Sequence, residues 1–109
     1  MMIGDWLDIG SVDQVAPGSA RTLPVHGGEE IAIFRTLAGT FHALINKCPH
    51  KQGPLSQGIV HGHAVTCPLH GWVIDLASGE PTGADAGKGC APTVPVLVKQ
   101  DRIFIPAEA

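Results

Sequence analysis

Two short segments, each with one cysteine and one histidine, constrain this chain more than any other feature. The first is Cys48-Pro49-His50, and the second is Cys67-Pro68-Leu69-His70. A thiolate is a sulfur ligand and an imidazole is a nitrogen ligand, so two such loops that face each other offer two sulfurs and two nitrogens to one metal site. We therefore expect a fold that brings residues 48–50 and 67–70 together.

The segment between the two loops can bring them together. Ile59-Val60 and His63-Ala64-Val65-Thr66 read as two strands, with His61-Gly62 as the two-residue turn of a β-hairpin. Such a hairpin returns the chain, so the second loop lies beside the first. Pro49 and Pro68 restrict the backbone directly after each cysteine. Three glycines near the loops allow close backbone approach and let N–H groups point at sulfur, namely Gly53, Gly58 and Gly71.

Two metal centres accept this ligand set. In a [2Fe-2S] cluster of mixed ligation, Cys48 and Cys67 would hold one iron while His50 and His70 hold the other. A tetrahedral zinc ion also accepts two cysteines and two histidines. Zinc modules usually pair cysteine with cysteine and histidine with histidine, whereas each arm here mixes the two types, so we favour the cluster. Zinc without iron or acid-labile sulfide in anaerobically purified protein would contradict this interpretation.

The sequence around these ligands resembles a Rieske [2Fe-2S] domain. Residues 46–76 carry the resemblance, and more narrowly they are similar to the small subunit of assimilatory NAD(P)H-dependent nitrite reductase. The similarity continues beyond the ligands and covers the chain from about Trp6 to Ile105. The segments that extend it are Trp72-Val73-Ile74-Asp75-Leu76, Ser78-Gly79-Glu80 and Thr82-Gly83-Ala84-Asp85.

The resemblance implies a role in electron transfer. It predicts one [2Fe-2S] Rieske cluster held by Cys48, His50, Cys67 and His70, and no catalytic residues on this chain. The expected partner is the large nitrite reductase subunit, which in that family holds flavin, a [4Fe-4S] cluster and sirohaem. The two subunits together form an oxidoreductase that reduces nitrite to ammonium with NADH or NADPH, in nitrite assimilation, and the sequence does not separate the two nucleotides.

A free Rieske ferredoxin that delivers electrons to a ring-hydroxylating dioxygenase is the alternative. Its ligand motif would look nearly the same, and a detached Rieske domain of an oxygenase is a third and weaker possibility. The segments 72–76 and 82–85 favour nitrite reductase. A neighbouring gene for a sirohaem protein would support that reading, and one for an oxygenase would reverse it.

Comparison with respiratory Rieske proteins implies a low reduction potential. Those proteins carry two additional loop cysteines, where this chain has Gly53 and Leu69, and they direct Ser and Tyr hydroxyls at the cluster, where it has Trp72 and Ile74. Hydroxyl donors favour the reduced cluster. We therefore expect a midpoint near about −150 mV rather than +300 mV.

The fold class implied is all-β. We expect a Rieske-type antiparallel β-sandwich or barrel, one domain over residues 1–109, with an inserted cluster-binding hairpin subdomain at about residues 46–76. A capped helical turn is expected at 11–15, a turn at 37–40 and an irregular segment at 77–93. The expected strands outside the hairpin are 6–9, 21–25, 31–36, 41–46, 72–76, 94–98 and 102–105.

Charge and hydropathy exclude other classes. Seven Lys and Arg against ten Asp and Glu give a net charge of −3 without a basic stripe, so nucleic-acid binding has no electrostatic basis. No apolar run reaches membrane-spanning length and the first residues lack a signal-peptide core, so we expect a cytoplasmic protein without membrane attachment. The remaining residues of note are expected to be ordinary surface groups, namely Cys90, His26, His42, His61 and His63.

Overall fold

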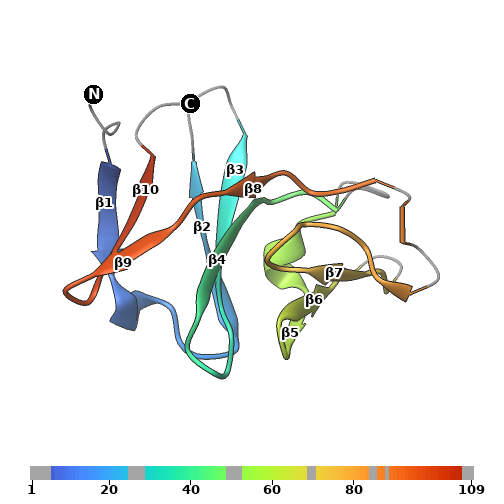
Figure 1. Cartoon of the computed structure of the whole chain (residues 1–109), viewed down its shortest axis with the longest axis horizontal. Helices are drawn as coiled ribbons and strands as arrows, with labels where there is room; N and C mark the ends of the chain where they lie inside the picture. Colours follow the sequence, from blue (N-terminus) through green and yellow to red (C-terminus); the bar gives the residue numbers. More distant parts are fainter. Residues whose placement is uncertain are drawn as a thin grey trace.

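The computed structural model is an all-β structure of three antiparallel sheets (Figure 1). It describes residues 6–24, 29–48, 53–68, 71–83, 86–87 and 89–106. The outer sheet has the order β1-β10-β9, the central sheet β2-β3-β4-β8 and the small sheet β5-β6-β7. The strands are β1 (Trp6–Ser11), β2 (Ser19–Pro24), β3 (Glu30–Arg35), β4 (Phe41–Ile45), β5 (Ile59–His61), β6 (Ala64–Thr66), β7 (Val73–Asp75), β8 (Thr93–Val94), β9 (Leu97–Lys99) and β10 (Arg102–Pro106).

Strand β3 is buried on both faces and gives the molecule its layers. Its four consecutive apolar residues, 31–34, are each no more than 5% exposed. Successive side chains in a strand point to opposite faces. Ile31 and Ile33 therefore pack on one side of the central sheet, and Ala32 and Phe34 pack on the other. A continuous apolar run is what a strand covered on both faces requires.

Two separate cores result. One core, which we call the aliphatic core, lies between the central and outer sheets and consists of Val15, Ile31, Ile33, Ala43, Ile103 and Ile105. The other, which we call the thiol core, lies between the central and small sheets. It consists of Ala32, Phe34, Leu44, Cys48, Leu55, Val65, Cys67, Trp72, Ile74, Leu76 and Ala91.

The hairpin between the cysteine loops is confirmed, with its turn shifted by one residue. His61 pairs with Ala64, so the two turn residues are Gly62 and His63, whereas the sequence pattern predicts His61 and Gly62. Gly62 has a φ of 55°. Glycine adopts positive φ without strain, which explains why the turn begins at Gly62.

The expected strand 94–98 is wrong as a single element. Pro95 interrupts it, and proline lacks the N–H that a strand ladder needs. The chain pairs with β4 through β8 and then crosses to the outer sheet, where β9 pairs with β10. The remaining strands agree with expectation to within a few residues, and the helical turn is a 3-10 helix at Val12–Gln14, capped by the Ser11 hydroxyl.

The described residues include no helix that is long and apolar enough to cross a membrane.

Candidate metal centre

The first cysteine loop follows β4. Cys48 is 1% exposed, and its backbone N–H donates to the carbonyl of Gly53 at 2.8 Å. This hydrogen bond joins the described residues on either side of positions 49–52. His50, the expected second ligand of this arm, lies outside the described residues.

The second cysteine loop has the same closure. Cys67 follows β6, is 2% exposed, and donates its backbone N–H to the carbonyl of Trp72 at 2.7 Å. The N–H of Gly71 donates to the carbonyl of Cys67 at 3.1 Å, and Gly71 has a φ of 73°. In both loops the cysteine amide therefore binds the carbonyl five residues ahead. His70 lies outside the described residues.

The two thiols converge in one core. Cys48 and Cys67 belong to the thiol core and are almost fully shielded from water. A lone thiolate in such surroundings is costly, whereas a metal centre compensates its charge. Among the described residues no three cysteine, histidine or acidic side chains form a metal-binding group, and two of the four expected ligands are not described. The two buried sulfurs fit the sulfur half of a mixed-ligand iron-sulfur cluster.

Close packing fixes the chain where it enters the hairpin. A Cβ atom on Gly58 would overlap the backbone carbonyl oxygen of Thr66 in β6. Gly58 has a φ of −81°, which any residue can adopt, so glycine is needed here for lack of space and not for backbone conformation. Trp72 is 9% exposed and belongs to the thiol core.

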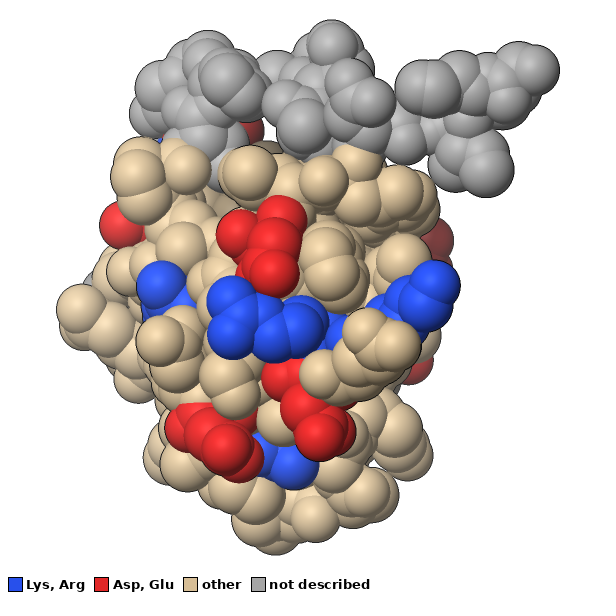
Figure 2. All heavy atoms as spheres, turned by 90° about the vertical axis from the view of Figure 1, so that its left-hand side faces the viewer, with Lys and Arg blue, Asp and Glu red and all other residues tan. Residues whose placement is uncertain are grey.

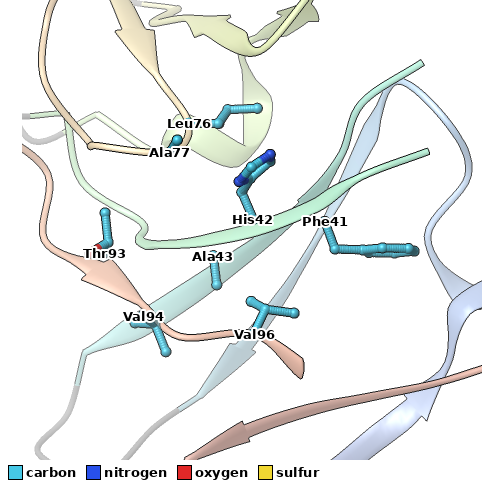
Figure 3. A pocket seen from close by; sticks show the side chains of 8 residues that line it. All are labelled: Phe41, His42, Ala43, Leu76, Ala77, Thr93, Val94 and Val96. Atoms are coloured by element: carbon cyan, nitrogen blue, oxygen red, sulfur yellow. The ribbon is translucent and has the colours of Figure 1, made fainter. Parts of the chain in front are cut away.

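His42 differs from the expectation of a solvent-facing imidazole. It is half-buried and lines a shallow pocket, pointing from β4 toward Leu76 and Ala77 (Figure 3). Burial lowers the pKa of His42, the nearby His63 lowers it further, and Asp75 opposes the shift. The rings of His42 and His63 meet edge to face with centroids 6.5 Å apart. The signal in the sequence was alternation, because a residue two positions before buried Leu44 shares its face.

The other singled-out residues are mostly surface groups. His61 is exposed, and its Nε2 lies 2.6 Å from the hydroxyl of Thr66. His63 and Cys90 are exposed, and His26 lies outside the described residues. The carbonyl of His63 accepts the backbone N–H of Leu76, directly after β7, at 2.9 Å.

Charges of both signs are mixed on the face formed by the outer sheet. Figure 2 shows acidic and basic side chains next to each other there. Arg102 forms a two-pronged ion pair with Asp8, with its nearest contact at 3.1 Å, and this hydrogen-bonded guanidinium lowers the pKa of Asp8. This face therefore carries no single-sign field of the kind that binds phosphates.

Known proteins similar in sequence include both long and short chains. The chain is 52% identical over 48 residues to the 4beta-methylsterol monooxygenase of Methylococcus capsulatus, which spans 44% of this chain and only 13% of that protein. It is 33% identical over 102 residues to the anthranilate 1,2-dioxygenase ferredoxin subunit of Burkholderia cepacia. That match covers 93% of this chain and 86% of the ferredoxin.

Solved structures share the fold along nearly the whole chain. A protein described as the NADH-dependent nitrite reductase small subunit of Mycobacterium tuberculosis superimposes with a TM-score of 0.84 at 25% identity, covering 99% of each chain. A chain in the complex of oxygenase and ferredoxin of carbazole 1,9a-dioxygenase superimposes with a TM-score of 0.82 at 24% identity, covering 94% of each chain.

The family model agrees with the geometry of the two loops. The model of the Rieske [2Fe-2S] domain matches residues 5–96, which include both cysteine loops and all of the central and small sheets. The resemblance noted in the sequence and the all-β fold are thereby confirmed. The chain belongs to the Rieske [2Fe-2S] domain family and carries one Rieske cluster, with which it acts as an electron carrier.

Proposed function

We propose that this chain is the electron-transfer small subunit of an NAD(P)H-dependent nitrite reductase. The observation that carries the proposal is the superposition on a chain described as such a subunit, because it covers 99% of both chains at a TM-score of 0.84. The sequence after the second cysteine loop, Trp72–Leu76, supports it, since this segment is similar to that family beyond the ligand motif. In this function the chain works in the cytoplasm and beside a large subunit that holds flavin, a [4Fe-4S] cluster and sirohaem.

The ligands of the cluster are part of the proposal. Cys48 and Cys67 hold one iron, and His50 and His70 hold the other, with residues 1–109 acting as one domain. The cluster, when bound, accepts and releases one electron at a time. The chain excludes water from the sulfurs by burying both cysteines in the thiol core, and it fixes each cysteine with a hydrogen bond from its own amide.

Hydrogen bonds stabilise the segment that is similar to nitrite reductase. The Asp75 carboxylate accepts the N–H groups of Ala77 at 2.8 Å and Ser78 at 3.3 Å, and the Asp75 N–H donates to the carbonyl of Glu80. Thr82 then donates its N–H to the carbonyl of Val73. These bonds fold residues 73–82 back on themselves directly after the loop that carries Cys67.

A ferredoxin of a ring-hydroxylating dioxygenase is the second candidate. It is favoured by one specific observation, the 33% identity to the anthranilate 1,2-dioxygenase ferredoxin subunit over 102 residues. The two candidates share the fold and the cluster, and they differ in the protein that receives the electron. Identification of that protein is therefore the decisive experiment.

The test is purification of the tagged chain from its own host grown on nitrite as the sole nitrogen source. We expect a second polypeptide to co-purify, with sirohaem and flavin absorbance and nitrite consumption that depends on NADH or NADPH. Deletion of the gene should abolish growth on nitrite, and the intact gene should restore it.

The Cys67→Ser variant is the matched control, because it retains the surface of the chain and removes one proposed ligand. It should fail to restore growth on nitrite. Co-purification of an oxygenase, with undisturbed growth of the deletion strain on nitrite, would establish the ferredoxin instead.

A further inference from the structure

The two cysteine loops are held at their ends by different means. The second loop lies between β6 and β7, which are paired neighbours, and Thr66 pairs with Val73 across its base. The first loop leaves β4 in the central sheet and leads to the 3-10 helix Leu55–Gln57 and then to β5 in the small sheet. Within the described part of the chain, β4 pairs with β3 and β8 and not with β5, so no strand ladder closes the first loop.

A single buried amide side chain joins the ends of the first loop. Asn46 follows β4, lies two residues before Cys48, and is 6% exposed. Its Oδ1 accepts the backbone N–H of Ser56 at 2.7 Å, and its Nδ2 donates to the Ser56 hydroxyl at 3.0 Å. Ser56 lies in the 3-10 helix on the far side of the loop. Asn46 and Ser56 therefore close a segment that contains both Cys48 and His50.

The same side chain also ties the loop to the central sheet. Nδ2 of Asn46 donates to Oε1 of Glu30 at 2.8 Å, and the backbone N–H of Asn46 donates to the carbonyl of Glu30 at 2.8 Å. An amide has two N–H donors and one carbonyl acceptor, and all three groups of Asn46 have partners. Removal of this side chain would leave the N–H of Ser56 without its acceptor in a partly buried site, which is costly.

We propose that Asn46 is a positioning residue of the metal centre. Its side chain holds the ends of the first cysteine loop together, as strand pairing does for the second loop. The inference rests on the proposed assignment of Cys48 and His50 as ligands. Asn46 touches neither the cluster nor a partner in this scheme, and it acts by fixing both ends of the loop. Its loss loosens the two ligands of the first loop and leaves Cys67 in place.

The test compares Asn46→Leu with Thr36→Val in the cluster-loaded protein. Leucine has the branched shape and the same number of side-chain heavy atoms as asparagine, and it makes none of its hydrogen bonds. Thr36 is the matched control, because it is the other buried polar residue of the described core and bonds Thr40 at the turn between β3 and β4. We expect Asn46→Leu to release iron to a chelator about tenfold faster than the parent. It should also broaden the electron paramagnetic resonance signal of the reduced cluster, while Thr36→Val changes neither.

Milder variants keep the proposal testable if Asn46→Leu does not fold. Glu30→Gln retains the acceptor for Nδ2 and should behave as the parent, whereas Glu30→Ala should release iron faster. Ser56→Ala removes one of the three contacts and should have an intermediate effect. Equal iron release and equal line widths in Asn46→Leu, Thr36→Val and the parent would overturn the proposal.

Failure of the ligand assignment would look different. If Cys48 is not a ligand, Cys48→Ser retains a full cluster, and this result overturns the assignment whatever Asn46→Leu does. If Cys48→Ser loses the cluster while Asn46→Leu retains the parent's release rate and spectrum, the assignment stands and the positioning role of Asn46 is wrong.

Discussion

The aliphatic core and the thiol core share the central sheet but differ in what builds them. The aliphatic core draws on β3, β4 and β10, strands of five or six residues with long antiparallel ladders. The thiol core draws on the three-residue strands β6 and β7 and on loop residues that include both cysteines. Short strands supply few ladder hydrogen bonds, so this half depends more on side-chain packing and on the metal centre. The comparison indicates that the half around the aliphatic core is stable without the metal centre, whereas the half around the thiol core depends on it.

Loss of a sulfur ligand should have the largest effect and should affect the two cores differently. In Cys67→Ser, iron should fall from about two atoms per chain to almost none, because serine does not replace a thiolate as a ligand. The aliphatic core contains no ligand and should still form. Iron and sulfide analysis, together with circular dichroism of the strands, measures both effects. Full unfolding of the variant would contradict the prediction that the aliphatic core forms without the metal centre.

The same substitution of one buried isoleucine by alanine in each core tests the difference between the two cores. Ile33 and Ile74 are both fully buried, in the aliphatic and thiol cores respectively. Each change to alanine should lower the free energy of unfolding by about 2–5 kcal/mol. Only Ile74→Ala should alter the paramagnetic resonance spectrum of the reduced cluster. Identical spectra for the two variants would mean that the cores do not differ in their influence on the metal centre. Denaturant unfolding followed by circular dichroism gives the stability.

Substitution of two glycines at the hairpin between the cysteine loops by alanine should destabilise the protein for different reasons. Gly58→Ala should lower the free energy of unfolding by about 1–3 kcal/mol, because its Cβ would overlap the Thr66 carbonyl, and it should also speed iron release. Gly62→Ala meets no atom within 4 Å and is strained only by its positive φ, so it should cost about 1 kcal/mol. Its iron release should match the parent. Faster release in Gly62→Ala than in Gly58→Ala would contradict the role given to the close contact.

The smallest expected effect concerns pH at the contact between the two halves. The pKa of His42 lies below its ordinary value of about 6.5, so the folded protein binds fewer protons at this site than the unfolded chain does. The contribution of His42 is fully present above about pH 6.5 and is lost as the pH falls toward the folded-state pKa. His42→Gln should therefore lose less stability than the parent between about pH 7.5 and pH 5.5. Parallel losses in denaturant titrations would show that His42 does not titrate at this contact.

Local patterns in the sequence predicted much of the fold and part of the site. The alternating and apolar runs predicted β1, β3 and β4, and the mixed cysteine and histidine motifs predicted the family. The burial of Cys48 and Cys67 in one core agrees with the expected convergence. Each of these features depends on residues that are close to one another in the sequence, so local patterns can predict it. The histidine ligands remain a prediction.

Other features depend on contacts between distant segments. At Pro95 the chain crosses from the central sheet, where β8 pairs with β4, to the outer sheet, where β9 pairs with β10. The sequence pattern predicts these two elements as one strand, 94–98. The contact of His42 with His63 in the turn of the small sheet, and the side-chain contacts of Asn46 with Glu30 and Ser56, join residues 10 to 21 positions apart in the chain. The sequence by itself determined the family and most of the strands, because these follow from local residue order. The tertiary structure alone decided which sheet each edge joined and which polar side chain closed the first loop, because those choices depend on the packing of all three sheets.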